Sequence, residues 1–155
     1  GLETVSLRYF NVFGPRQDPS SPYSGVISIF TDKLMNSQVP TIYGDGEQTR
    51  DFVYVSDVVE ANMRAVQEES AAGQVCNIAT GNKITLNELL NTLYEIQNQE
   101  FAANYDEPRQ GDIKESYATV DKAAEVLNWK STVELKQGLE ILLGEQDKEL
   151  NKKTA

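Results

Sequence analysis

Two arginines with the chemistry of an anion site stand in stretches that predict loops. Arg50 precedes Asp51, and Arg109 opens the segment RQGD at residues 109–112. A guanidinium offers a planar fork of donors that matches a phosphate or a carboxylate, and a loop can aim it. Spacing alone favours a plainer interpretation, in which each arginine forms a surface ion pair with its acidic neighbour.

Other polar residues give weaker indications of chemistry. Asn11 follows the end of a predicted strand, where α/β proteins place ligands, but it equally suits a turn before Gly14 and Pro15. Asp18 and Asp112 could act as general bases, although neither has a visible partner carboxylate. Composition and spacing therefore predict an α/β domain with, at most, an anion site.

The composition excludes several classes of function. The chain has no histidine, so a Ser-His-Asp triad and a histidine-based zinc site are impossible, and we predict no metal. With 14 Lys and Arg against 24 Asp and Glu, the formal charge of −10 argues against a nucleic-acid partner. No apolar run is long enough to span a bilayer, so we expect no membrane partner. The one cysteine, Cys76, forms no internal disulfide, which favours a reducing cytoplasm, and we expect Cys76 and Trp129 in the core.

Strand and helix patterns alternate along the chain. The first half predicts a strand at 5–10, a loop at 11–24, a helix at 26–36, strands at 41–43 and 52–55, and a helix that Asp57 caps and that ends near Glu68. The second half predicts strands at 75–79 and 101–105, a helix opened by a capping box of Thr85 and Glu88, a short helix from Asp121, and a last helix opened by a capping box of Ser131 and Glu134. This alternation predicts an α/β fold in a single domain, residues 1–155.

Three ordered segments of the chain resemble one enzyme family. They are LRYFNVFGPRQDP at 7–19, IYGDGEQTRDFVYVSDVV at 42–59 and PRQGDIKESYATVDKAAEVLNW at 108–129. Together they resemble the NAD-dependent epimerases and dehydratases, which are extended short-chain dehydrogenases, and among these the UDP-glucose and UDP-N-acetylglucosamine 4-epimerases. The resemblance implies the end of a Rossmann-type parallel sheet together with the small mixed α/β substrate-binding domain.

The resemblance also indicates what the chain lacks. No Gly-x-Gly-x-x-Gly stands between a strand and a helix, and no Tyr-x-x-x-Lys occurs. The family carries both motifs upstream of the part seen here, so the resemblance implies the carboxyl-terminal half of an epimerase without its amino-terminal NAD-binding domain. We therefore assign no catalytic residue, expect NAD only in the complete protein, and expect the chain alone to be inactive.

The resemblance further implies contacts with a UDP-sugar and with NAD. Tyr9 and Phe10 would border the nicotinamide, and Asn11 would hydrogen-bond the diphosphate of the substrate. Gly25, Val26, Thr41, Ile42 and Tyr43 would surround the uracil, Arg50 and Arg109 would clamp the pyrophosphate, and Asp112 would accept hydrogen bonds from the ribose. With the family weighed, a ligand role replaces the plain ion pair for both arginines.

Ser116 stands where these epimerases carry a residue that borders the C2 substituent of the sugar. A bulky aromatic side chain there excludes an N-acetyl group, whereas a small one leaves room. We therefore expect the complete enzyme to accept UDP-N-acetylhexosamines as well as UDP-glucose and UDP-galactose. The alternative is an ordinary exposed serine after a loop.

Two alternatives to the 4-epimerase remain on this evidence. One is a nucleotide-sugar 4,6-dehydratase or decarboxylase of the same family, and the other is a non-catalytic module that binds UDP-sugars. If the chain is the carboxyl-terminal half of a longer enzyme, loss of the upstream half should uncover an apolar face on the strand at 5–10 and on the helices packed against it. Exposed strand edges and apolar patches drive association, so we expect a homo-oligomer or association with the missing half.

Overall fold

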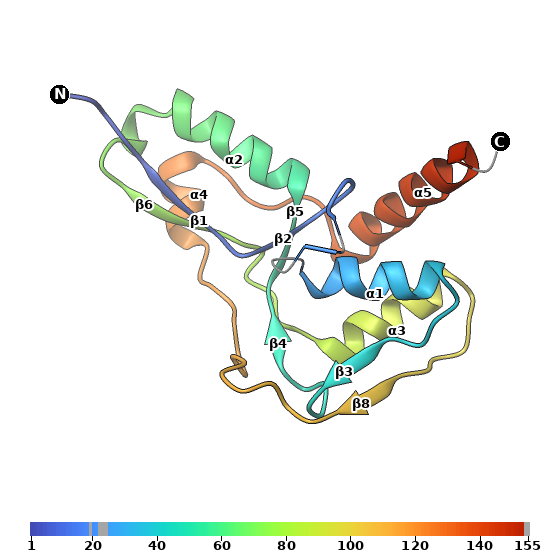
Figure 1. Cartoon of the computed structure of the whole chain (residues 1–155). Coiled ribbons are helices and arrows are strands. Elements are labelled where there is room, and N and C mark those ends of the chain that lie inside the picture. The colour runs from blue at the N-terminus through green and yellow to red at the C-terminus, as the bar shows by residue number, and fades with distance from the viewer. Residues whose placement is uncertain (19, 22–24, 154–155) are drawn as a thin grey trace.

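Short strand pairs with helices packed beside them make up the frame of the chain (Figure 1). The computed structural model describes residues 1–18, 20–21 and 25–153. The strands are β1 (Ser6–Tyr9), β2 (Asn11–Phe13), β3 (Thr41–Tyr43), β4 (Thr49–Arg50), β5 (Phe52–Tyr54), β6 (Val75–Ile78), β7 (Ile84–Thr85) and β8 (Asn104–Asp106). The helices are α1 (Val26–Met35), α2 (Val55–Gln67), α3 (Leu86–Ile96), α4 (Asp121–Leu127) and α5 (Leu135–Lys153), with a 3₁₀ turn at Glu69–Ala71.

Most strands pair in parallel with strands that lie far from them in the sequence. β1 pairs with β6, β2 with β5 and β3 with β8, all in parallel, whereas β4 and β7 are antiparallel. Parallel neighbours need a crossover connection, which is why helices alternate with the strands. In Figure 1, α2 and α4 lie near β1 and β6, while α1 and α3 lie near β3 and β8. The predicted α/β class is confirmed.

Strand β5 separates two apolar cores. Phe52 and Tyr54 belong to the core that α1, α3 and α5 enclose, and Val53 belongs to the core beneath α2 and α4. Successive side chains of a strand point to opposite faces, so one strand supplies both cores. Cys76 and Trp129 lie buried in the second core, as predicted. Burial raises the pKa of the Cys76 thiol, which keeps it protonated.

Two buried aspartates fasten loops to this frame. The Asp51 carboxylate accepts hydrogen bonds from the Thr80 backbone N–H at 2.8 Å, from the Thr80 hydroxyl at 2.7 Å and from the Gly81 N–H at 2.9 Å. The Asp57 carboxylate accepts from the Thr132 N–H at 3.0 Å, the Thr132 hydroxyl at 2.8 Å and the Val133 N–H at 3.0 Å. A buried carboxylate is tolerated where several donors satisfy it.

Two predictions about where helices begin are wrong, and both concern residues that Asp57 involves. It does not cap the helix that follows β5, because α2 already begins at Val55 and Asp57 lies within its first turn. The predicted capping box of Ser131 and Glu134 is also wrong, because α5 begins at Leu135. Thr132 and Val133, which follow Ser131, instead donate their N–H groups to Asp57.

Other differences concern short strands. Residues 11–13, predicted as loop, form β2, because Phe13 is buried beside β5. The predicted strand at 101–105 is shifted to 104–106, where it pairs with β3, and β4 and β7 were not predicted. The helix at 26–36, the strand at 41–43 and the Thr85–Glu88 capping box are confirmed within a residue.

None of the helices in the described ranges combines the length and the apolar character needed to cross a membrane.

Replacing Asp57 by alanine should lower the free energy of unfolding by about 2–3 kcal/mol, because the Thr132 and Val133 donors lose a charged acceptor. Urea denaturation followed by circular dichroism measures the change. Glu140→Ala is the matched control, because Glu140 is an exposed carboxylate on α5 and its loss should change stability by less than about 0.5 kcal/mol. Equal midpoints for the two variants would contradict the role given to Asp57.

Candidate functional site

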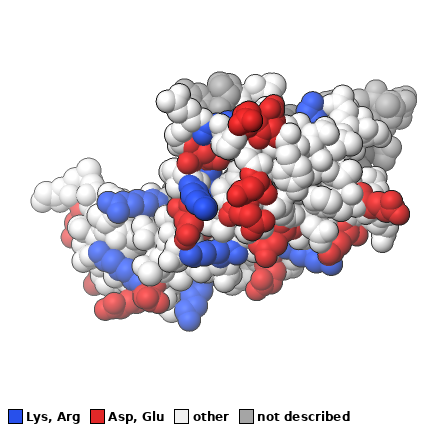
Figure 2. Space-filling model, turned by 90° about the horizontal axis from the view of Figure 1, so that it is seen from below, with Lys and Arg blue, Asp and Glu red and all other residues white. Residues whose placement is uncertain are grey.

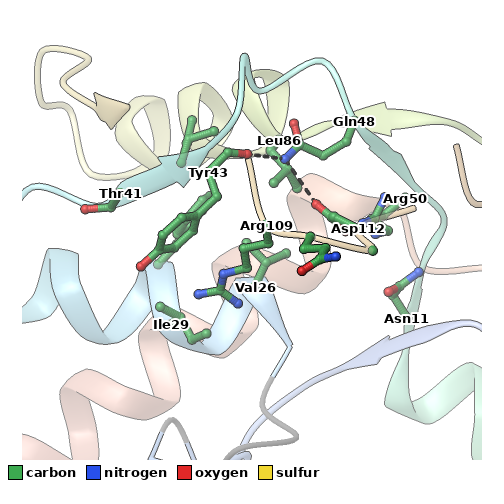
Figure 3. Close-up of a pocket in the computed structure, with 14 residues that line it drawn as sticks. Asn11, Val26, Ile29, Thr41, Tyr43, Gln48, Arg50, Leu86, Arg109 and Asp112 are labelled. Carbon is green, nitrogen blue, oxygen red and sulfur yellow. Dashed lines mark hydrogen bonds and ion pairs between the residues drawn. The ribbon is translucent and has the colours of Figure 1, made fainter. Parts of the chain in front are cut away.

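A pocket of about 380 Å³ opens between α1, β3, β4 and the loop that follows β8 (Figure 3). This volume is typical of small-molecule sites. The pocket collects most of the residues predicted to bind a ligand, namely Asn11, Val26, Thr41, Ile42, Tyr43, Arg50, Arg109 and Asp112. Ile29, Phe30 and Leu86 add apolar side chains to the lining, so the pocket presents both polar and apolar groups.

The loop that carries Arg109 and Asp112 is fastened at both ends. At its start, β8 pairs with β3, and the Gly44 N–H donates to the Asp106 carbonyl at 2.8 Å. At its end, the Thr49 N–H of β4 donates to the Lys114 carbonyl at 2.8 Å. Gly44 has a φ of +87°, a conformation that a glycine adopts without strain. Two strands therefore set where this loop crosses the pocket.

Arg50 makes three hydrogen bonds within the protein, which leave part of its five-donor guanidinium for a ligand. Its guanidinium donates to the Asp112 carboxylate at 2.5 Å and to the carbonyls of Thr49 and Ile113 at 2.8 and 2.6 Å. Its side chain is 16% exposed. The plain interpretation paired Arg50 with its neighbour Asp51, but that carboxylate is buried and bound elsewhere, so the partner comes from the distant loop instead.

Arg109 has a different environment. Its guanidinium carbon lies 4.0 Å from the centre of the Tyr43 ring, within cation–π range. Acidic side chains spread over the face that carries β3 and β8, with basic ones between them (Figure 2). Even so, no ion pair among the described residues includes Arg109. Its N–H donors are therefore available to a ligand in the pocket. Figure 3 shows the Arg109 side chain beside Val26 and Ile29.

Gln48 lines the pocket but was not among the residues predicted from the sequence. It is buried, and its Nε2 donates to the Tyr43 carbonyl at 2.7 Å and lies 3.5 Å from an Asp112 carboxylate oxygen (Figure 3). The side chain thus joins β3 to the loop across the pocket. Its Oε1 is buried and has no partner within the described part of the chain. Only the fold reveals this role, because Asp112 lies far away in sequence.

Asn11 lies at the opposite side of the pocket from Tyr43 (Figure 3). Its backbone N–H and its Nδ2 both donate to the Asp51 carbonyl, each at 3.1 Å. One Nδ2 hydrogen and the Oδ1 oxygen remain for a ligand. Asn11 begins β2, so the predicted turn at this residue is replaced by a strand.

Four of the predicted residues lie outside this pocket. Gly25 is the N-cap residue of α1 and lines a smaller neighbouring pocket with Asn11. Ser116 is half-buried, and its N–H donates to the Thr49 carbonyl at 3.1 Å. Tyr9 and Phe10 lie at the end of β1, where the Tyr9 hydroxyl donates to Asn62 Oδ1 at 2.8 Å.

The segment before Ser116 is held by a charged cluster. Lys83 Nζ lies 2.8 Å from a Glu115 carboxylate oxygen and 4.0 Å from the centre of the Tyr117 ring. The hydrogen bond to Glu115 raises the pKa of Lys83, and the same bond lowers the pKa of Glu115. Both groups are therefore charged at neutral pH.

In the part of the chain that the structure covers, no group of three or more His, Cys, Asp or Glu residues could hold a metal ion.

A family model described as the NAD dependent epimerase/dehydratase family matches residues 1–79 of this chain. A putative UDP-glucose 4-epimerase of Methanocaldococcus jannaschii is 45% identical over 139 residues, which are 90% of this chain and 44% of that protein. UDP-glucuronic acid decarboxylase 5 of Arabidopsis thaliana is 32% identical over 142 residues, 92% of this chain and 40% of that protein. The chain thus spans less than half the length of these curated relatives.

Solved structures of epimerases are also similar to this chain over less than half of their length. The UDP-glucose 4-epimerase of Thermotoga maritima, with UDP-glucose, has a TM-score of 0.91 and 41% identity over 96% of this chain and 47% of its own. The UDP-N-acetylglucosamine 4-epimerase of Methanobrevibacter ruminantium M1, in complex with UDP-N-acetylmuramic acid, has a TM-score of 0.89 and 36% identity over the same shares. The UDP-glucuronic acid 4-epimerase of Bacillus cereus, with UDP-glucuronic acid and NAD, has a TM-score of 0.84 and 30% identity over 93% of this chain and 45% of its own.

Proposed function

This chain belongs to the NAD dependent epimerase/dehydratase family, and from that premise we propose that it is the nucleotide-sugar-binding half of a UDP-hexose 4-epimerase. The observation that carries the proposal is the pocket, which gathers the base, phosphate and ribose positions that the sequence resemblance assigns. The similarity to UDP-glucose 4-epimerases over nine-tenths of the chain supports the same activity. The single buried thiol of Cys76 supports a reducing, cytoplasmic location.

In this proposal each wall of the pocket holds one part of the UDP group. Thr41, Ile42 and Tyr43 on β3 lie beside the uracil, with Val26 and Gly25 at the start of α1. Arg109 and Arg50 bind the diphosphate, because guanidinium groups match phosphate oxygens. Asp112 bonds the ribose hydroxyls and Asn11 the diphosphate. The chain would thus hold the UDP group while the sugar turns, so that binding energy from an unreacting part positions the reacting one.

NAD belongs to the proposal as the cofactor of the complete protein. It supplies hydride exchange at C4 of the sugar when it is bound. Because no glycine-rich phosphate loop and no Tyr-x-x-x-Lys occur in this sequence, we propose that most of the NAD site lies outside these residues. We propose that Tyr9 and Phe10 border the nicotinamide from the end of β1, and that the chain alone is inactive.

A decarboxylase or 4,6-dehydratase of the same family is the second candidate. The match to a UDP-glucuronic acid decarboxylase over 92% of the chain favours it, because the same UDP pocket can serve another reaction at the sugar. Product analysis with the complete protein separates the two enzymes. A non-catalytic module that binds UDP-sugars is a further alternative, and it predicts UDP binding without turnover in any complete form.

We further propose that β1 and α2 form the surface that meets an NAD-binding half. Val59, Met63 and Val66 lie on α2 at 58, 51 and 85% exposure, and Tyr9 of β1 is 49% exposed. The spacing of the three α2 residues puts them on one side of the helix, where they form an exposed apolar stripe. Parallel sheets are usually covered on both faces, and relatives of twice the length have the residues to provide that cover.

Calorimetric titration of the chain with UDP should give saturable binding that Arg109→Ala weakens by at least about tenfold, because a charged donor to the diphosphate is lost. The double variant Arg50→Ala, Arg109→Ala should abolish binding. Arg64→Ala is the matched control, because Arg64 pairs with Glu60 on α2 and should not affect UDP. An unsubstituted chain without affinity for UDP would contradict the proposed function.

Light scattering at high protein concentration should reveal self-association of the isolated chain, which the double substitution Val59→Lys, Met63→Glu reduces because it places charges on the apolar stripe. Ile141→Lys changes an exposed apolar residue of α5 outside the stripe and should leave association unchanged. A chain that stays monomeric at all concentrations would argue against this surface.

Ser116 should set the tolerance for an N-acetyl group in a complete enzyme. A chimaera in which the unmatched part of the Methanocaldococcus jannaschii relative completes this chain should epimerise both UDP-glucose and UDP-N-acetylglucosamine. Ser116→Tyr should remove the second activity and spare the first, whereas Ser116→Ala should keep both. Turnover of UDP-glucose with none of UDP-N-acetylglucosamine in the unsubstituted chimaera would refute the assignment.

A further inference from the structure

The two arginines of the pocket differ in what holds them. Arg50 is fixed by an ion pair with Asp112 and by two backbone carbonyls, so most of its N–H groups are already used. Arg109 makes no ion pair within the described ranges, although Asp106 and Glu107 lie only three and two residues before it in the sequence. A long side chain without such a partner would ordinarily sample many rotamers. An interaction other than an ion pair must therefore keep it in the pocket.

The ring of Tyr43 supplies this restraint. The guanidinium carbon of Arg109 lies 4.0 Å from the ring centre, and both side chains line the pocket. A guanidinium that stacks on an aromatic face keeps its in-plane N–H groups free, whereas an ion pair would consume them. The stack thus orients the arginine and preserves its donors for a phosphate.

The backbone holds the ring itself in place. Tyr43 is the last residue of β3, where it is in register with Asp106 of β8, and its carbonyl accepts a hydrogen bond from Gln48 Nε2 at 2.7 Å. Arg109 follows β8 by only a few residues, so the same strand pair sets the positions of both partners. The Tyr43 hydroxyl has no hydrogen-bond partner among the residues that the structure describes, so the ring face is its contribution here.

We propose that Tyr43 is a positioning residue for Arg109, and that through this stack it strengthens binding of the diphosphate in addition to its place beside the base. The inference rests on the proposed function, because it assumes a uridine diphosphate ligand. It adds to the role given to Tyr43, whose ring the resemblance places beside the uracil. If the ring positions Arg109, its removal costs UDP more affinity than it costs uridine.

The test compares UDP with uridine, which keeps the base and ribose but has no phosphate. UDP is titrated by calorimetry and uridine by NMR chemical shifts, which follow weak binding. Tyr43→Leu should weaken UDP by about threefold to tenfold more than it weakens uridine, the size expected for loss of a cation–π contact. Tyr43→Phe keeps the ring and should bind both ligands as the unsubstituted chain does.

A double-mutant cycle shows whether the effect passes through Arg109. In an Arg109→Ala background, Tyr43→Leu should cause no loss of UDP affinity beyond the loss seen for uridine, because the group that the ring positions is already gone. Tyr43→Met serves as a second non-aromatic variant if the leucine variant does not fold, and circular dichroism checks both.

The outcomes separate the inference from the proposed function. Equal losses for UDP and uridine on removing the ring would overturn the positioning role and give Tyr43 to the base. Additive losses in the double variant would overturn it as well. If the unsubstituted chain binds uridine and UDP equally, the diphosphate contact fails, and if it binds neither, the proposed function fails and the inference with it.

Discussion

The arrangement of the pocket depends on the hydrogen bonds that the buried residue Asp51 accepts through its carboxylate and its backbone carbonyl. Asp51 lies between β4 and β5 and binds the turn after β6 through Thr80 and Gly81. Its own carbonyl accepts both hydrogen bonds from Asn11 at the start of β2. One residue therefore connects strands from three parts of the chain, and Arg50 enters the pocket from the position directly before it. Replacing Asp51 would therefore disturb the pocket, although Asp51 itself does not line it.

Prediction from sequence succeeded where the information is local. Amphipathic spacing and the Thr85–Glu88 capping box located helices, because a helix satisfies its own backbone within a few residues. The short strands β4 and β7 escaped prediction, because two residues have no pattern of their own and exist only through their partner. Resemblance to a family then brought in most of the pocket residues, which spacing alone left undecided between ligand contact and ion pair.

The residues that escaped are those whose role depends on a distant partner. Gln48 reaches Asp112, and Arg50 pairs with that same carboxylate instead of with the adjacent Asp51. Sequence neighbours suggested a pair that the fold does not make, since the Asp51 carboxylate is buried and accepts hydrogen bonds from Thr80 and Gly81. Pairings of this kind follow from the strand register and cannot be read from spacing.

The position of β5 between two cores has a consequence for how the chain comes apart. Val53 packs into one core while Phe52 and Tyr54 pack into the other, so neither core can open without uncovering a residue of the same three-residue strand. The two cores share strand β5, so the unfolding of one core exposes part of the other. Folding of the pocket is thereby coupled to folding of the β1–β6 end, and unfolding should be a single cooperative event.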